Sequence, residues 1–209
     1  MLTSLILQGT EPNNIDFTII QGSTFNPTLF YAQAPLTSVP ITGITKGGQA
    51  VVTSTHTLTR DWPVYVSTVA GMVQLNHNPS DLKRLSRAYQ AYYVSGTSLQ
   101  LDQDSSNYSA YVSGGELLFH APVALATATA SMQIRPQPGV TTVAALEALT
   151  SSSGITLGAA DGSIGILIAS TVTAGFTFTD AVYDLLVTIS GVTTRLCTGH
   201  VYVLPEITQ

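Results

Sequence analysis

The sequence predicts an all-β protein: a β-sandwich interrupted by a small barrel-like β module, with one or two short helices. Short runs rich in Val, Ile and Thr, which suit a pleated sheet, recur along the chain. Clusters of Gly, Asn, Asp, Pro and Ser separate these runs, as they separate the strands of sandwiches and barrels. Only two segments have the spacing of an amphipathic helix.

The predicted strands are distributed over both halves of the chain. They are residues 15–19, 25–31, 49–54, 63–69, 92–94, 98–101, 116–119, 128–135, 155–157, 163–168, 183–190 and 193–203. The stretch Ser190-Gly191-Val192-Thr193 predicts a tight hairpin, because Gly191 is free to adopt a positive φ. Asp161-Gly162 predicts a second turn of the same kind.

Two segments have helical features. Residues 80–92 begin with Ser80, a favourable N-cap, and Asp81, an acid in the first turn, and they place Leu82, Leu85, Ala88 and Tyr89 on one face. Residues 142–149 carry apolar side chains at i, i+3 and i+6 and end at the turn-forming residues 151–154. The sequence therefore predicts a short helix in each segment.

The chain has very little charge. Only 19 of its 209 residues are charged, and the mean hydropathy is +0.30, whereas about a quarter of the residues of an ordinary soluble domain carry charge. No apolar stretch approaches the roughly 18 residues that span a bilayer. The sequence therefore predicts no membrane contact. Because charge keeps soluble proteins apart, the scarcity of charge predicts that other subunits cover much of the surface and that the protein is a component of an assembly.

The ionisable residues exclude several function classes. Seven basic residues and a net charge of −5 argue against sequence-independent binding of nucleic acid. Cys197 is the only cysteine, so no internal disulfide can form, and a buried hydrophobic position in a strand is expected for it. The four histidines lack metal-ligand spacing, and no nucleophile elbow, phosphate loop or privileged carboxylate pair occurs. We therefore expect no enzyme activity, no cofactor and no metal.

Residues 102–107 superficially resemble a calcium loop, but Asn107 and Ser113 stand where that loop needs Gly and Glu, so a polar turn is expected.

One cluster is a candidate docking surface for a partner. It combines the only basic group of the chain with neighbouring tyrosines, a residue type enriched at interfaces: Lys83, Arg84, Arg87, Tyr89, Tyr92 and Tyr93. On a helix Arg84 and Arg87 would share one face. The alternative is an ordinary solvated helix face above Leu82, Leu85 and Ala88.

Five stretches in the first half of the chain form a recognisable pattern. They are the Val-Thr strand 50–56, the strand 62–66, the turn Gly71-Met72-Val73-Gln74-Leu75-Asn76, the strand 98–101 and the stretch 107–115, which ends in Gly114-Gly115. In this pattern the first half resembles a small β module that recurs in structural proteins of tailed bacteriophages and is likened to the FCCH domain of ubiquitin-activating enzymes. Thr57 replaces a glycine of the family pattern.

The remainder of the chain carries a second pattern in residues 20–25, 128–135, 154–157, 161–162, 182–185, 194–196 and 199–203. In these stretches it is similar to a phage virion β-sandwich, the N-terminal domain of siphophage upper baseplate proteins. Together the two resemblances imply a discontinuous sandwich of residues 1–44 and 118–209, with the small module inserted at 45–117. Neither implies a catalytic activity.

These resemblances imply a structural protein of a tailed double-stranded DNA phage, assembled in the host cytoplasm and located in the virion. It would be a tail, baseplate or collar subunit that forms a homo-oligomer in a symmetric assembly and binds other virion structural proteins or fibres. Two alternatives are a capsid cement or decoration protein, and a host-glycan-binding module that uses exposed Tyr side chains and Trp62 of the insert. The uneven charge further predicts that the sandwich makes the lattice contacts and the insert faces solvent or an exchanging partner.

Overall fold

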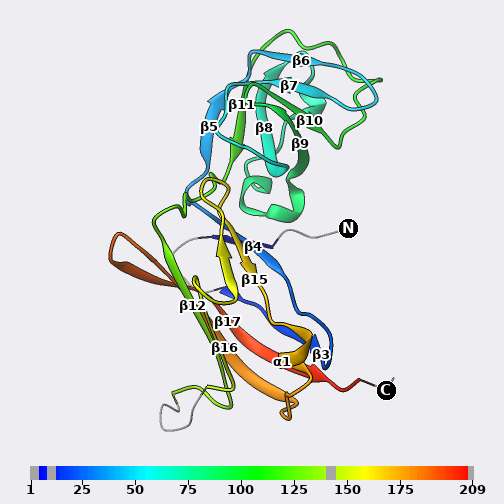
Figure 1. The fold of residues 1–209 in the computed structure, drawn as a ribbon. Coiled ribbons are helices and arrows are strands. Elements are labelled where there is room, and N and C mark those ends of the chain that lie inside the picture. Colours follow the sequence, from blue (N-terminus) through cyan, green and yellow to red (C-terminus); the bar gives the residue numbers. More distant parts are fainter. Residues whose placement is uncertain (1–4, 9–12, 140–144, 207–209) are drawn as a thin grey trace. The chain divides into compact units, whose positions relative to one another are not determined.

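The computed structural model describes residues 5–8, 13–139 and 145–206. Its contacts divide the chain into two compact units, coloured along the sequence in Figure 1. The sandwich unit consists of Met1–Ala32 and Pro122–Gln209, and the inserted unit of Gln33–Ala121. The insertion is longer than the predicted 45–117, because residues 37–45 pair with strands of the inserted unit.

The sandwich unit is built from two sheets. One has the order β1-β4-β15-β14; the other has the order β13-β12-β16-β17-β2, and β3 also pairs with β17. The strands are β1 (Leu5–Gln8), β2 (Asn13–Asn14), β3 (Phe17–Ile20), β4 (Thr28–Ala32), β12 (Thr129–Arg135), β13 (Glu147–Thr150), β14 (Ile155–Leu157), β15 (Ser163–Ile166), β16 (Asp180–Ile189) and β17 (Val192–Leu204). A single helical turn, α1 (Ser170–Thr173), precedes β16.

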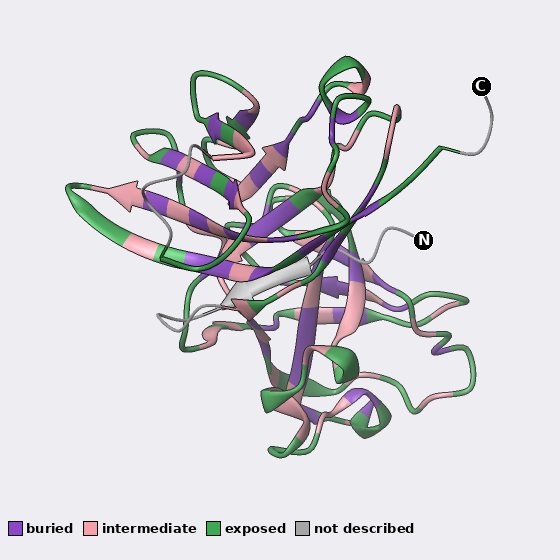
Figure 2. Cartoon of the chain, turned by 90° about the horizontal axis from the view of Figure 1, so that it is seen from below, coloured by how far each residue is buried: buried purple, intermediate pink, exposed green. Residues whose placement is uncertain are grey.

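The core of this unit follows from alternation along most of the strands, which β4 and β17 each break with two consecutive buried residues. In β16, Ala181, Tyr183, Leu185 and Val187 are buried, while the residues between them are half-buried or exposed, and Figure 2 shows this alternation as changing colours along the ribbons. Cys197 is fully buried in the same core, as the sequence predicts. One face of each strand is thus sequestered, which stabilises the fold by about 25 cal/mol for each Å² of apolar surface removed from water.

Both predicted turns of the sandwich unit are confirmed. Ser190 and Gly191 both have positive φ, 51° and 81°, and Ile189 pairs with Val192, which is the two-residue turn that fits the twist of a hairpin. Asp161 and Gly162 lie in the connection of β14 to β15, where the Asp161 carboxylate accepts hydrogen bonds from the amide and hydroxyl of Ser163.

The inserted unit is a small barrel. Its strands are β5 (Thr37–Pro40), β6 (Gly43–Thr45), β7 (Val51–Thr53), β8 (Trp62–Ala70), β9 (Tyr89–Ser95), β10 (Ser98–Leu101) and β11 (Ser113–Phe119), in the order β5-β11-β8-β9-β10-β7-β6. Residues 37–45 close the ring. Within this segment the amide of Ile41 donates to the carbonyl of Gly115 on β11, and the amide of Thr42 donates to the carbonyl of Thr53 on β7.

The Gly-Met-x-x-Leu-Asn stretch has a structural role in this barrel. Gly71 adopts a φ of 88°, and an added Cβ there would collide with the carbonyl oxygen of Ala110. The chain then forms the turn η1 (Val73–Leu75), and Met72 before the turn and Leu75 within it are fully buried. The Asn76 amide accepts from the Val69 amide at 2.9 Å and donates to the Val69 carbonyl at 3.0 Å, so it replaces a neighbouring strand at that point of β8.

Neither predicted helix forms among the described residues. Residues 80–92 contain two 3₁₀ turns, η2 (Asp81–Lys83) and η3 (Leu85–Arg87), followed by β9. The Ser80 side chain caps nothing, and β9 gains ladder bonds to β8 and β10 that an isolated short helix could not match. In the second segment residues 147–149 belong to β13, which pairs with β12, and residues 142–144 lie outside the described part of the chain.

Candidate functional site

The predicted docking cluster is divided in two by the structure. Lys83, Arg84 and Arg87 are exposed in the 3₁₀ turns that precede β9. Tyr92 and Tyr93 are 40% and 39% exposed in the middle of β9. An extended strand rises about 3.3 Å for each residue, which puts Tyr92 about 17 Å along the chain from Arg87. The shared helix face that the sequence suggested does not exist.

Tyr89 belongs to the framework of the inserted unit. Its hydroxyl donates to the carbonyl of Leu75 at 3.1 Å, and its ring contacts the His77 ring with centroids 4.3 Å apart. Burial raises the pKa of Tyr89 to about 12. The His77 imidazole in turn contacts the carbonyl of Arg87 at 2.8 Å and the backbone of Val66. These contacts fasten the loop before β9 to β8, so the hydroxyl and ring of Tyr89 serve the internal framework of the unit.

Tyr93 lies beside two other polar side chains of the inserted unit. Its amide donates to the carboxylate of Asp61 at 2.8 Å, which ends the pairing of β9 with β8. Its ring meets the His56 ring edge to face with centroids 6.2 Å apart. His56 is 8% exposed, and neither ring nitrogen reaches a hydrogen-bond partner in the described chain. Burial therefore lowers the pKa of His56 below 6.5, and the nearby backbone of Ser98 and Leu58 offsets part of this effect.

The sequence suggested that Trp62 is exposed and could bind a glycan, and its position in the structure shows that this is wrong. It is 1% exposed, and its indole Nε1 donates to the carbonyl of His120 at 2.8 Å. The strand β8 turns this side chain into the barrel core because it stands on the same face as the buried Val64. Trp62 therefore stabilises the inserted unit and offers no surface to a ligand.

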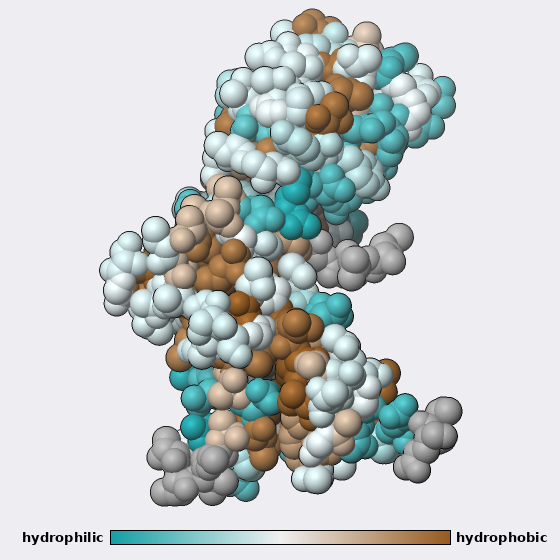
Figure 3. Space-filling model, viewed as in Figure 1, coloured by the Kyte–Doolittle hydropathy of each residue, from teal (hydrophilic) through white to brown (hydrophobic). Residues whose placement is uncertain are grey.

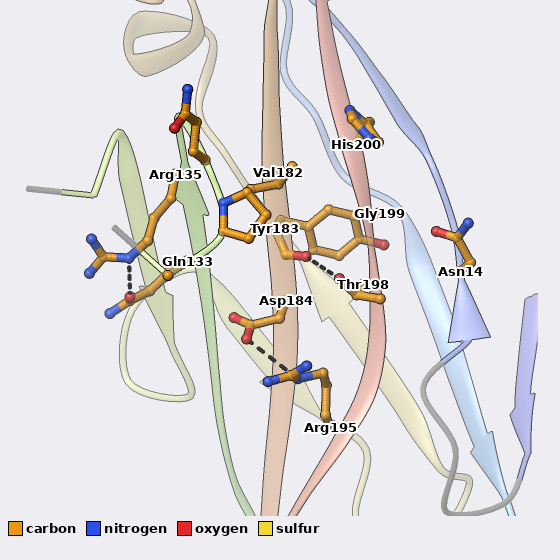
Figure 4. Close-up of a pocket in the computed structure, with 13 residues that line it drawn as sticks. Asn14, Gln133, Arg135, Val182, Tyr183, Asp184, Arg195, Thr198, Gly199 and His200 are labelled. Atoms are coloured by element: carbon orange, nitrogen blue, oxygen red, sulfur yellow. Dashed lines mark hydrogen bonds and ion pairs between the residues drawn. The ribbon is translucent and has the colours of Figure 1, made fainter. Parts of the chain in front are cut away.

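A hollow of about 380 Å³ lies on the sandwich unit. It opens on the outer face of the sheet that contains β12, β16 and β17, as Figure 4 shows. Side chains from these strands, from β2 and from the loop after β12 line it: Asn14, Gln133, Arg135, Gln137, Pro138, Gly139, Val182, Tyr183, Asp184, Arg195, Thr198, Gly199 and His200. Most of these lining groups are polar.

Strand register brings these residues together. Arg135 pairs with Val182, which pairs with His200 on the other side of β16. One pleat further along, Gln133 pairs with Asp184 and Asp184 with Thr198. Residues that share a row and a face of a sheet lie about 5 Å apart, so positions separated by some 60 residues of sequence form one surface. Sequence reasoning missed this site because the register of distant strands leaves no local signal.

Each charged side chain of the hollow has a polar partner on the same sheet. The Nε of Arg195 lies 3.6 Å from the Asp184 carboxylate, and both side chains are well exposed. The Nε of Arg135 donates to the Gln133 side chain at 3.0 Å. His200 contacts the Asp180 carboxylate at 2.9 Å through Nδ1, and this hydrogen bond raises the pKa of His200. An exposed ion pair such as Arg195–Asp184 contributes about 0–1 kcal/mol, so Arg195 can exchange this partner for a ligand.

The stretch that resembles a calcium loop is a polar turn, as the sequence predicts. Residues 102–107 form a turn in which the Asp104 carboxylate accepts from the Ser106 amide at 2.9 Å and the buried Ser105 hydroxyl bonds to Gly47. Across the described ranges, no group of three or more His, Cys, Asp and Glu side chains is placed to hold a metal ion. No helix within the part of the chain that the structure describes has the length and apolarity to cross a membrane.

The amino-acid sequence was compared with protein families and with curated proteins. The sequence matches no protein family, and no curated protein is similar enough to be matched with it.

Proposed function

We propose that this protein is a structural subunit of the tail, baseplate or collar of a tailed double-stranded DNA phage. The proposal joins the sequence resemblance of both units with the surface of the sandwich unit. That unit holds only nine of the 19 charged residues, although it is the larger of the two. Its role would be assembly with copies of itself and with other virion proteins.

The observation that carries the proposal is a pair of exposed aliphatic side chains at a sheet edge. Ile20 and Leu204 are 53% and 51% exposed and are register partners on β3 and β17, and Tyr202 lies two residues before Leu204 at 40% exposure. On the face drawn in Figure 3, brown apolar atoms gather over the sandwich unit. Exposed apolar clusters of this kind mark protein–protein contacts.

The edge strand itself supports strand-to-strand assembly. β3 contains no charged residue and no proline, which are the usual devices against edge pairing. The amides of Ile15 and Gln21 donate to β17 carbonyls, so alternation directs the backbone of Thr18 away from β17, toward the open side of the sheet. A neighbouring subunit that added a strand there would also cover Ile20 and Leu204.

Quantitative mass spectrometry of purified heads and purified tails tests the proposal. A tail, baseplate or collar subunit is present in tails at a few to a few dozen copies per particle, whereas a capsid decoration protein is present in heads at hundreds of copies. Absence from both fractions would contradict any structural role in the particle. Leu204→Lys should reduce incorporation strongly, whereas Val192→Lys, which changes an exposed apolar residue in the β16–β17 hairpin, serves as the matched control.

A further inference from the structure

The cationic side chains of the sandwich unit are gathered at one place. The unit contains two of the seven Lys and Arg residues, Arg135 and Arg195, and one of the four histidines, His200. All three line the hollow on the outer sheet face. The same unit contains seven of the twelve acidic residues, and Asp184 is the only one of them among the lining residues. The hollow thus collects the cationic side chains of an otherwise acidic unit, with the carboxylates of Asp184 and Asp180 beside them.

From this arrangement we infer that the hollow binds a carboxylate-bearing saccharide. The two guanidinium groups supply the planar donor pairs that recognise a carboxylate. The Asn14 amide offers a donor and an acceptor, and the Gln133 amide nitrogen donates while its oxygen accepts from Arg135. The Thr198 hydroxyl donates to the Tyr183 carbonyl at 2.9 Å and keeps its acceptor lone pairs, so together these groups match sugar hydroxyls that donate and accept at once.

The geometry favours such a ligand over an extended acidic peptide. The volume of about 380 Å³ is at the small end of the range for small-molecule sites, about 300–1,000 Å³, so it suits a compact ligand. A peptide would need a groove or a free strand edge, and the hollow lies over β12, β16 and β17, each of which is already paired on both sides.

Arg195 is the side chain best placed to hold the acid group. Its side chain is 56% exposed, its Nε contacts Asp184 at the long distance of 3.6 Å, and Figure 4 shows it extending across β16 toward that carboxylate. Asp184 therefore competes with a bound anion for the same guanidinium. This predicts opposite effects on binding when the two residues are neutralised.

The test is a chemical-shift titration of the ¹⁵N-labelled full chain with D-glucuronate, D-glucose and succinate at matched ionic strength. D-Glucuronate should produce saturable shifts at the amides of β12, β16 and β17 around Asp184. D-Glucose, which lacks the acid, and succinate, which lacks the hydroxyls, should each bind at least about tenfold more weakly, the loss expected for a charged hydrogen bond left unmade. Absence of saturable shifts with D-glucuronate would overturn the inference, and succinate binding as tightly would replace the saccharide with a general carboxylate such as an acidic peptide.

Variants make the test independent of folding. Arg195→Gln should weaken D-glucuronate binding about tenfold or more, whereas Asp184→Asn should strengthen it, a result that a misfolded protein cannot give. Arg84→Gln removes the same charge from the inserted unit and should leave the affinity unchanged. Equal affinities for Arg195→Gln and Arg84→Gln, or loss of binding in Asp184→Asn, would show that the hollow is not the site.

Discussion

The Asn76 side chain offers the sharpest test of how the inserted unit is held together. Its amide completes the hydrogen bonds of both backbone groups of Val69, at 2.9 and 3.0 Å. Val69 is 3% exposed, so water reaches its backbone poorly once the amide is removed. Replacing Asn76 with Ala therefore leaves a donor and an acceptor unsatisfied within β8.

The expected loss can be worked from these two bonds. Leaving a buried polar group without a partner costs about 1–3 kcal/mol, and the bonds here are partly buried, so Asn76→Ala should lower the free energy of unfolding of the inserted unit by about 2–4 kcal/mol. In a unit of this size each kcal/mol corresponds to a decrease in melting temperature of about 4–8 °C.

Trp62 makes the measurement specific to this unit. It is the only tryptophan of the chain and is 1% exposed within the barrel, so its fluorescence during urea unfolding of the full chain follows the inserted unit alone. Gln74→Ala is the matched control, because Gln74 is also an amide in the same turn but makes a single exposed contact of 3.4 Å to Ser109. It should cost less than about 0.5 kcal/mol. Equal losses in the two variants would refute the assigned role of Asn76.

Three further predictions concern stability. Burial lowers the pKa of His56 below 6.5, so at low pH the unfolded chain binds a proton that the folded chain resists, and the free energy of unfolding followed by Trp62 fluorescence should be complete above pH 6.5 and decrease below it. His56→Phe should flatten this pH dependence, and an unchanged profile in the variant would contradict the role of His56. Burial raises the pKa of Cys197 to about 11, so iodoacetamide at pH 8 should label this thiol only when the sandwich unit unfolds, and rapid labelling of the native protein would contradict its placement. Gly191→Ala should cost about 1–2 kcal/mol by circular dichroism, since its φ is 81° and an added Cβ meets nothing within 4 Å; a neutral effect would show that the turn can change type.

The hairpin at Ser190-Gly191 illustrates what could be predicted from sequence. Its signal is local, since two small residues between alternating runs suffice to define a two-residue turn, and the structure has both at positive φ. The all-β class was predictable for the same reason, because alternation and β-branched composition are properties of each strand taken alone. The buried position of Cys197 followed from the general preference of free cysteines for the core.

The segment 80–92 shows where the local signal misleads. Ser80 and Asp81 resemble a helix start, yet the following tyrosines form β9, whose hydrogen bonds come from β8 and β10. Strand partners distant in sequence decided the outcome, and the extended backbone then separated Arg87 from Tyr92. The domain boundary was missed for a similar reason. In the sequence residues 37–45 resemble a connection, and only their pairing with the distant strands β11 and β7 shows that they belong to the barrel.

The sequence by itself determined the all-β class, the hairpin turns and the low charge that suggests an assembly role, because each depends on residue types and short spacings. Tertiary structure alone decided which residues share a surface. The meeting of Arg135, Arg195 and His200 at one hollow depends on the register of β12, β16 and β17, and the burial of Trp62 depends on closure of the barrel. Register and closure are set by packing among many distant residues, so no local stretch of the chain encodes them.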